Sequence, residues 1–353
     1  MDSFETSTLD YRQWIGSTDA ELGTALADTS KIHRYQAFNG QAFNVLEVDG
    51  RRGEGGPVIV GAASFDCRID PLLTKRMGIL AHHSGARVFM AELPGVTVDH
   101  ADPFHTRGAW QTPMQTAMAA AGNFDMLAKK QLKAIDSIAH FQDGDEIQLF
   151  GQSMGAYSAA SMARVLAKNS YRKQIVISKM TLVEPVNAWR NNNAIEHFKM
   201  VRNLIVNEDA RRQVYLDEND LIGHPTAAYE QLTDETKRIH QHMRSRISQR
   251  MAAYAAGMGL RKSLYTVLSD VISDRDPGGT HLHEADITVA RASSSTVSLD
   301  TDLLALSDAA HEQGVWLRLT EFEAGAGDPT PLGHHSADSL GRMADLALYM
   351  ANR

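Results

Sequence analysis

The sequence predicts an α/β fold: a doubly wound, mostly parallel sheet with helices on both faces. Short apolar segments typical of buried strands lie at residues 57–63, 87–93, 146–150 and 179–184. Segments with helical periodicity alternate with them, at residues 71–83, 124–141 and 154–168. Such alternation is typical of a parallel sheet with helical crossovers. The length of 353 residues, with 43% hydrophobic residues, is sufficient for a large core.

Further elements are expected toward both ends of the chain. Residues 10–27 have helical character. The β-like segments 33–38 and 43–48 flank Asn39-Gly40, a pair typical of a hairpin turn. The C-terminal part adds two strands and a helix, at residues 286–292, 315–322 and 338–350.

The alternation of strands and helices is interrupted after Glu184. Before residue 286, apolar residues recur at helical spacing, for example Ile239, Met243 and Ile247. We therefore predict a helical cap inserted after the sixth strand. The expected domains are an N-terminal extension, an α/β core in two segments and the cap, at residues 1–30, residues 31–187 with 258–353, and residues 188–257.

The pentapeptide Gly151-Gln152-Ser153-Met154-Gly155 has the pattern G-x-S-x-G and lies between a predicted strand and a predicted helix. On a sharp strand-to-helix turn, the oxygen of Ser153 would project from the sheet as a nucleophile. Glycines at both ends of the motif allow the strand and the helix to approach closely. The backbone N–H of Met154, at the helix N-terminus, is placed to stabilise an oxyanion. The alternative interpretation is that the glycines only permit a tight turn.

With this motif, the sequence resembles the α/β-hydrolase superfamily of serine esterases and lipases over about residues 33–353. Residues 57–64 resemble the third strand and oxyanion loop of that family, and residues 91–95 resemble the end of its fourth strand. The usual His-Gly pair after the third strand is replaced by Ala62-Ala63. The resemblance implies that the second oxyanion N–H belongs to Ser64 or Phe65.

The resemblance also implies a histidine base after the last strand, since a serine hydroxyl needs a base to remove its proton. Gly333-His334-His335-Ser336 lies there. His334 follows the glycine, as the family's base does, so we expect His334 to be the base. His335 is the alternative.

The acid of the triad departs from the commonest pattern of the family. Its usual place, directly after the strand at residues 286–292, is taken by Ser293-Ser294-Ser295. Some branches of the family take the acid from the end of the preceding strand, where Glu184 lies. A carboxylate that ends an apolar strand is costly without a partner. We therefore expect Glu184 to be the acid.

Other sources of the acid stay open. The alternatives are Asp300 and Asp302, although Ser298-Leu299-Asp300 is also typical of a helix N-cap. A dyad without a carboxylate, or an acid elsewhere in the chain, is a further possibility.

Neither a metal nor a cofactor is expected. His281, His283 and Glu284 would suit a metal at a strand edge, but a solvated loop after Pro277-Gly278-Gly279 is the commoner situation. Cys67 is the single cysteine, which excludes a disulfide framework and a thiolate zinc site.

The charge balance and the N-terminus limit the possible partners. Lys and Arg number 35 against 43 Asp and Glu, and a net charge of −8 argues against binding to nucleic acid or anionic membranes. The acidic first residues do not resemble a secretory signal. The apolar segments are shorter than the roughly 18 to 20 residues of a membrane span. We therefore expect a cytoplasmic protein without a transmembrane segment.

The expected activity is hydrolysis of a carboxylic ester through an acyl-enzyme. Ser153 would attack the acyl carbon, His334 would carry the proton, and Glu184 would orient the histidine. The substrate would be a small-molecule ester, and methionines of the cap such as Met243, Met251 and Met258 would suit an apolar acyl chain, although ordinary core packing is commoner. The alternatives are an acyltransferase with the same triad and an inactive hydrolase-like scaffold that binds a ligand.

Overall fold

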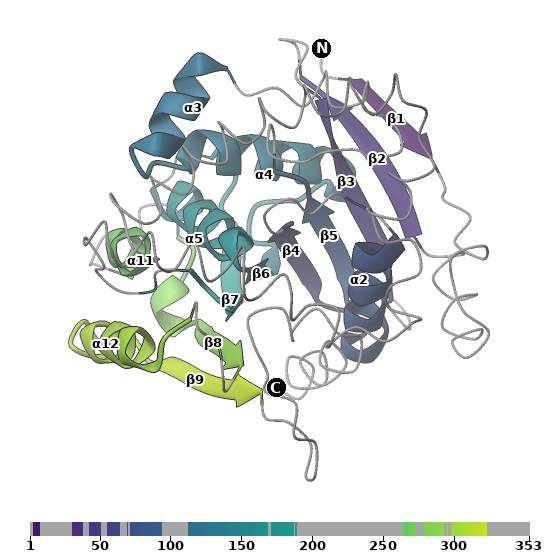
Figure 1. The fold of residues 1–353 in the computed structure, drawn as a ribbon. Coiled ribbons are helices and arrows are strands. Elements are labelled where there is room, and N and C mark those ends of the chain that lie inside the picture. The colour runs from purple at the N-terminus through teal and green to yellow at the C-terminus, as the bar shows by residue number, and fades with distance from the viewer. Residues whose placement is uncertain are drawn as a thin grey trace, which may run out of the picture.

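The computed structural model describes residues 3–7, 30–37, 42–50, 55–63, 69, 71–93, 112–168, 171–186, 188, 264–272, 279–292, 295 and 298–322. Nine strands form one sheet in the order β1-β2-β3-β5-β4-β6-β7-β8-β9 (Figure 1). The pairs among β1, β2, β3 and β5 are antiparallel, and the five pairs from β5 to β9 are parallel. This confirms the predicted α/β fold with a mostly parallel sheet.

The antiparallel edge of the sheet comes from the N-terminal part of the chain. Strands β2 (Ser30–Gln36) and β3 (Ala42–Asp49) pair antiparallel, in agreement with the predicted hairpin. Strand β1 (Ser3–Ser7) adds an edge that the sequence did not indicate, because its residues are mainly polar. The helix predicted at residues 10–27 lies outside the described residues.

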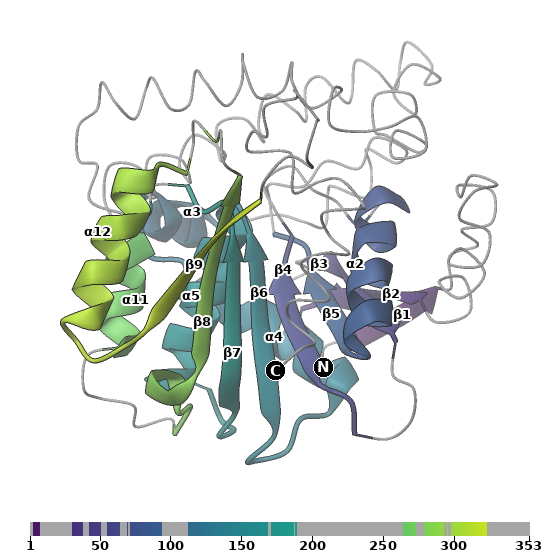
Figure 2. The ribbon, with the colours of Figure 1, turned by 90° about the horizontal axis from the view of Figure 1, so that it is seen from below.

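The parallel strands are short and apolar because helices cover both of their faces. Figure 2 shows them side by side, with helices to either side. Their bounds agree with the predicted segments to within about two residues, apart from β7, which starts at residue 176 and not at residue 179. The strands are β4 (Val58–Ala62), β5 (Arg87–Ala91), β6 (Glu146–Gln152), β7 (Val176–Val183), β8 (Asp286–Ala292) and β9 (Leu317–Phe322).

One described helix, α2 (Pro71–Ser84), covers one face of the sheet, and five cover the other (Figure 1). Those five are α3 (Pro113–Ala120), α4 (Asp125–Ala139), α5 (Met154–Ala167), α11 (Leu264–Ile272) and α12 (Asp300–His311). Two separate core clusters result, one on each face. Helix α12 begins at Asp300, but its N-cap is Leu299, which makes no side-chain capping bond.

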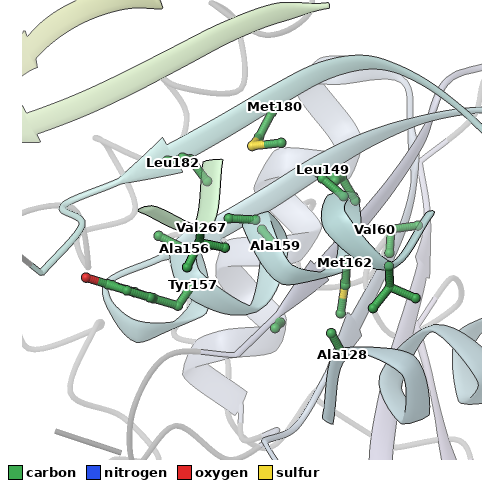
Figure 3. Close-up of a cluster of buried hydrophobic side chains, with 14 of the residues drawn as sticks. Val60, Ala128, Leu149, Ala156, Tyr157, Ala159, Met162, Met180, Leu182 and Val267 are labelled. Carbon is green, nitrogen blue, oxygen red and sulfur yellow. The ribbon is translucent and has the colours of Figure 1, made fainter. Parts of the chain in front are cut away.

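Helix α5 lies at the centre of the larger core. Every one of its residues is buried, as expected for a helix covered on all sides. Small side chains such as Ala156 and Ala159 let α5 approach the sheet, where they pack near Leu149 and Leu182 (Figure 3). This packing fixes the N-terminus of α5, and therefore Ser153, against the strands.

The two ends of the long connection between β7 and β8 meet beside α5. The buried hydroxyl of Tyr157 donates to the carbonyl of Val186 at 2.7 Å and also bonds to the backbone of Leu264. The N–H of Tyr265 donates to the carbonyl of Ala188 at 3.0 Å. In Figure 3 this hydroxyl points away from the apolar side chains. Burial raises the pKa of Tyr157, so the phenol stays neutral. The predicted cap lies outside the described residues except for Ala188, and its boundaries stay a prediction.

A buried charge cluster lies on the antiparallel side of the sheet, away from this connection. Glu47 on β3 is 2.7 Å from the Nε2 atom of His33 and accepts from Nε of Arg87 at 2.8 Å. Burial acts to raise the pKa of Glu47, but the hydrogen bonds and charges of His33 and Arg87 outweigh it. The pKa of Glu47 is therefore below its ordinary value of 4.5.

Candidate active site

Ser153 occupies the turn between β6 and α5, with φ 54° and ψ −120°. A positive φ is unfavourable for a residue with a side chain, so the surrounding structure must hold it. The N–H of Ser153 donates to the carbonyl of Val183 at 2.8 Å, which ties the turn to the neighbouring strand β7. The expected strained strand-to-helix turn is therefore present. The role of Ser153 as a nucleophile stays a prediction.

The two glycines of the motif are required by close packing of backbone. A Cβ atom at Gly155 would lie 2.5 Å from the carbonyl oxygen of Ala62 at the end of β4. A Cβ atom at Gly151 would collide with the carbonyl group of Gly155. Only glycine fits these positions without a backbone shift. The N-terminus of α5 therefore touches both β6 and β4.

The carboxyl ends of the parallel strands β6 and β7 bring two of the candidate residues, Ser153 and Glu184, to one edge of the sheet. Gln152 is in register with Val183, and Val183 with Ala290. The residues that follow these strands, Ser153 after β6 and Glu184 after β7, are therefore neighbours at this edge. Both side chains are buried.

Glu184 is completely buried and reaches across to the end of β8. Its backbone has φ 49°, and its N–H donates to the carbonyl of Ala290 at 2.7 Å. One carboxylate oxygen, Oε1, accepts from the N–H of Ala292, and the other, Oε2, accepts from the hydroxyl of Ser295 at 2.6 Å. The carboxylate thus lies at the end of β8, and most α/β-hydrolases have their triad acid directly after the corresponding strand.

The two alternative acids have different surroundings. Asp300, at the start of α12, pairs with the buried guanidinium of Arg291, and its side chain is 64% exposed. Asp302 is half-buried in the first turn of α12, and burial raises its pKa. The structure therefore places the Glu184 carboxylate in the most buried position of the three.

One of the expected oxyanion donors lies within the described residues. Met154 is the buried first residue of α5, so its N–H has no partner within the helix. Ser64 and Phe65 lie outside the described residues. The described residues that precede them are Ala62 and Ala63. Ala62 lies against the start of α5, and the N–H of Ala63 donates to the carbonyl of Ala91 at 2.8 Å.

The expected base also lies outside the described residues, as do both of its candidates, His334 and His335. Strand β9, which precedes them, is parallel to β8 and ends at Phe322. Strand β9 therefore ends at the same edge of the sheet as β6 and β7, which Ser153 and Glu184 follow. The assignment of the base stays a prediction.

Two residues near this edge were not identified from the sequence. Glu92, after β5, is buried and accepts from the N–H groups of Asn44 at 2.9 Å and Ile69 at 3.0 Å, which tethers the chain after β4. Glu184 was identified because it ends an apolar strand. Glu92 also ends an apolar strand, so the same signal could have identified Glu92. Ser295 is the second residue, and only its contact with Glu184 reveals it.

No group of three His, Cys, Asp or Glu side chains suited to a metal ion occurs within the described ranges. His281 and Glu284, at the short 3-10 turn η6 (Leu282–Glu284), lie 3.7 Å apart between Nδ1 and Oε2. Both side chains are more than half exposed. Among the helices the structure describes, none is long and apolar enough to cross a membrane.

Similarity to known proteins is found among solved structures. No family model matches it, and no curated protein does. It is similar to a mutant of the esterase rPPE, with 14% identity, 96% of this chain and 90% of that chain covered, and a TM-score of 0.48. It is also similar to a putative esterase from Staphylococcus aureus, with 10% identity, coverage of 88% and 79%, and a TM-score of 0.48.

A third similar structure is the thioesterase domain from the curacin biosynthetic pathway, with 15% identity, coverage of 89% and 96%, and a TM-score of 0.48. The strand order of this chain, its parallel pairs and the serine at the turn between β6 and α5 agree with the resemblance described from the sequence. The described residues thus form the mostly parallel α/β sheet that the sequence predicts.

Proposed function

We propose that the protein is a serine hydrolase that cleaves a carboxylic ester. One observation supports this most directly. Ser153, at the turn between β6 and α5, has a positive φ and is a neighbour of the buried Glu184. A strained serine and a buried acid both lower the stability of the fold, and strain of this kind is concentrated at functional sites.

The proposed reaction has two halves. Oγ of Ser153 attacks the acyl carbon while His334 takes its proton, and the electron pair of the carbonyl moves onto the oxygen. The N–H of Met154, with that of Ser64 or Phe65, stabilises this oxyanion. The carbonyl re-forms, the alkoxide leaves with the proton from His334, and the acyl group remains on Ser153. Water then repeats the sequence and releases the carboxylic acid.

Glu184 serves in this proposal as the group that orients the base. Each of its two oxygens accepts a hydrogen bond from the end of β8. A carboxylate has about four lone-pair positions, and in this proposal one of them accepts from an imidazole N–H. Holding His334 in one tautomer and orientation is the role this acid has in a triad.

The test uses a fluorophosphonate probe and p-nitrophenyl acetate with the purified full chain. We expect the wild type to be labelled at Ser153 and to hydrolyse the ester, and we expect Ser153→Ala to lose both activities. Labelling of Ser153→Ala at the wild-type rate, or a wild type inert to both reagents, would contradict the proposal. Ester products formed in the presence of an added alcohol would instead favour acyl transfer.

The same assay assigns the acid and the base. We expect Glu184→Gln to lower kcat by about 10³ to 10⁴, the effect of removing the orienting carboxylate from a triad. Asp300→Asn and Asp302→Asn are the matched controls and should keep kcat within a factor of three or so. His334→Ala should inactivate the enzyme and His335→Ala should not. The reverse pattern in either pair would reassign that role.

A further inference from the structure

We propose that Ser295 is a positioning residue of this site, acting through Glu184 and not on the substrate. This inference rests on the proposed function, in which Glu184 orients the base. The turn after β8 holds serines where most α/β-hydrolases have an acid. In this protein the turn supplies hydrogen-bond donors to a carboxylate that comes from the neighbouring strand.

Two hydrogen-bond donors at the end of β8 hold the carboxylate of Glu184. The N–H of Ser295 donates to the carbonyl of Ala292 at 3.0 Å, and this bond closes a turn. The N–H of Ala292 and the hydroxyl of Ser295 therefore reach the same carboxylate, one at each oxygen of Glu184. Glu184 is 0% exposed and Ser295 is 8% exposed, so water contributes little to these bonds.

The direction of the hydroxyl bond is fixed by a second residue of the turn. The N–H of Ser298 donates to Oγ of Ser295 at 3.0 Å. The hydroxyl oxygen thus accepts one hydrogen bond and directs its own proton to Oε2 of Glu184 at 2.6 Å. Donors linked in this way polarise one another, and a hydroxyl that donates to a charged acceptor makes a stronger bond than a neutral pair.

Two donors on different oxygens prevent the carboxylate from rotating about its last side-chain bond. The carboxylate then has a fixed orientation, and an imidazole can bind to it in one orientation. Loss of the Ser295 hydroxyl removes the donor to Oε2 and keeps the N–H of Ala292 at Oε1. Misplacement of a catalytic group by about 1 Å can cost 10²-fold in rate. Ser295 should therefore affect kcat and leave substrate binding unchanged.

The experiment compares Ser295→Ala, Ser295→Thr and Ser298→Ala in the full chain. We expect Ser295→Ala to lower kcat for p-nitrophenyl acetate and the rate of fluorophosphonate labelling about tenfold, with KM unchanged, since a bond to a charged group is lost. Ser295→Thr keeps a hydroxyl and should restore most of the rate. The buried hydroxyl of Ser298 has no partner within the described part of the chain. Ser298→Ala keeps the backbone donor and is therefore the matched control.

A double-mutant cycle distinguishes positioning through Glu184 from a general structural role. In the Glu184→Gln background we expect Ser295→Ala to cause no further loss of kcat. A second tenfold loss in that background, or an equal loss in Ser298→Ala, would overturn the inference. Should Ser295→Ala fail to fold, Ser295→Cys, with a much weaker donor, replaces it in the cycle.

The failure of this inference is distinguishable from the failure of the proposed function. Wild-type kcat in Ser295→Ala, together with inactive Ser153→Ala and Glu184→Gln variants, overturns the role of Ser295 and leaves the hydrolase function in place. A wild type that neither hydrolyses the ester nor reacts with the probe overturns both.

Discussion

The contact between α5 and β4 predicts that Gly155→Ala disrupts the site without touching a catalytic side chain. The new Cβ would lie 2.5 Å from the carbonyl oxygen of Ala62, whereas ordinary van der Waals contact begins at 3.4 Å. Helix α5 must then move from β4 by about 1 Å, because the colliding atom belongs to backbone. The displacement carries Ser153 and the N–H of Met154 with it.

The magnitude follows from two opposing effects. Overpacking of a tight core costs about 1 to 3 kcal/mol, and alanine in place of glycine within a helix contributes up to ~1 kcal/mol of stability. We expect Gly155→Ala to lower the free energy of unfolding by about 1 to 2 kcal/mol. Since a shift of about 1 Å at a catalytic group can cost 10²-fold, the rate of fluorophosphonate labelling should fall by roughly that factor.

Urea unfolding and probe labelling measure these two quantities on the same sample. Ser161→Ala is the matched control in the same helix, because its buried hydroxyl finds no partner among the residues the structure describes. We expect that control to unfold within about 0.5 kcal/mol of wild type and to label normally. A Gly155→Ala protein with wild-type stability and labelling would refute the close-packing argument.

Two further predictions concern buried polar groups away from the nucleophile. Glu47→Gln should lower stability at pH 7 by about 1 to 3 kcal/mol. Because folding lowers the pKa of Glu47, its contribution to stability is present above pH 4.5 and is lost as the pH falls through the folded-state pKa. The difference between Glu47→Gln and wild type in urea unfolding should therefore shrink at pH 3. A difference independent of pH would contradict this. Tyr157→Phe removes the buried bond to the carbonyl of Val186 and should cost about 1 to 3 kcal/mol, and an unchanged urea midpoint would argue against that bond.

The parts of the fold that the sequence predicted are those encoded by local patterns. Uniformly apolar segments such as residues 57–63 identify buried parallel strands, because both faces of such strands are covered. The pattern G-x-S-x-G identified a turn whose two glycines are needed by backbone packing within and beside it. Strand β1 (Ser3–Ser7) was missed because an edge strand of polar residues is defined by its partner and not by its own composition.

The start of β7 was missed for a related reason. The strand begins at Val176, but Ser178 and Lys179 break its apolar pattern, and the pairing with β6 is irregular between Ile147 and Gln148. Polar residues are tolerated in the first part of β7 because Ser178 and Lys179 are only half-buried there. Composition alone placed the strand too late.

The acid site shows why long-range geometry is needed even where each residue is visible in the sequence. Glu184 and Ser295 are 111 residues apart, and only the parallel pairing of β7 with β8 brings them together. Neighbouring strands are about 4.8 Å apart, and a glutamate side chain is long enough to cross that distance. A carboxylate from the end of β7 can therefore reach the place that an aspartate after β8 would occupy. If Glu184 is the acid, as we propose, the serine after β8 is a donor to that acid and its presence does not mean that the site lacks an acid.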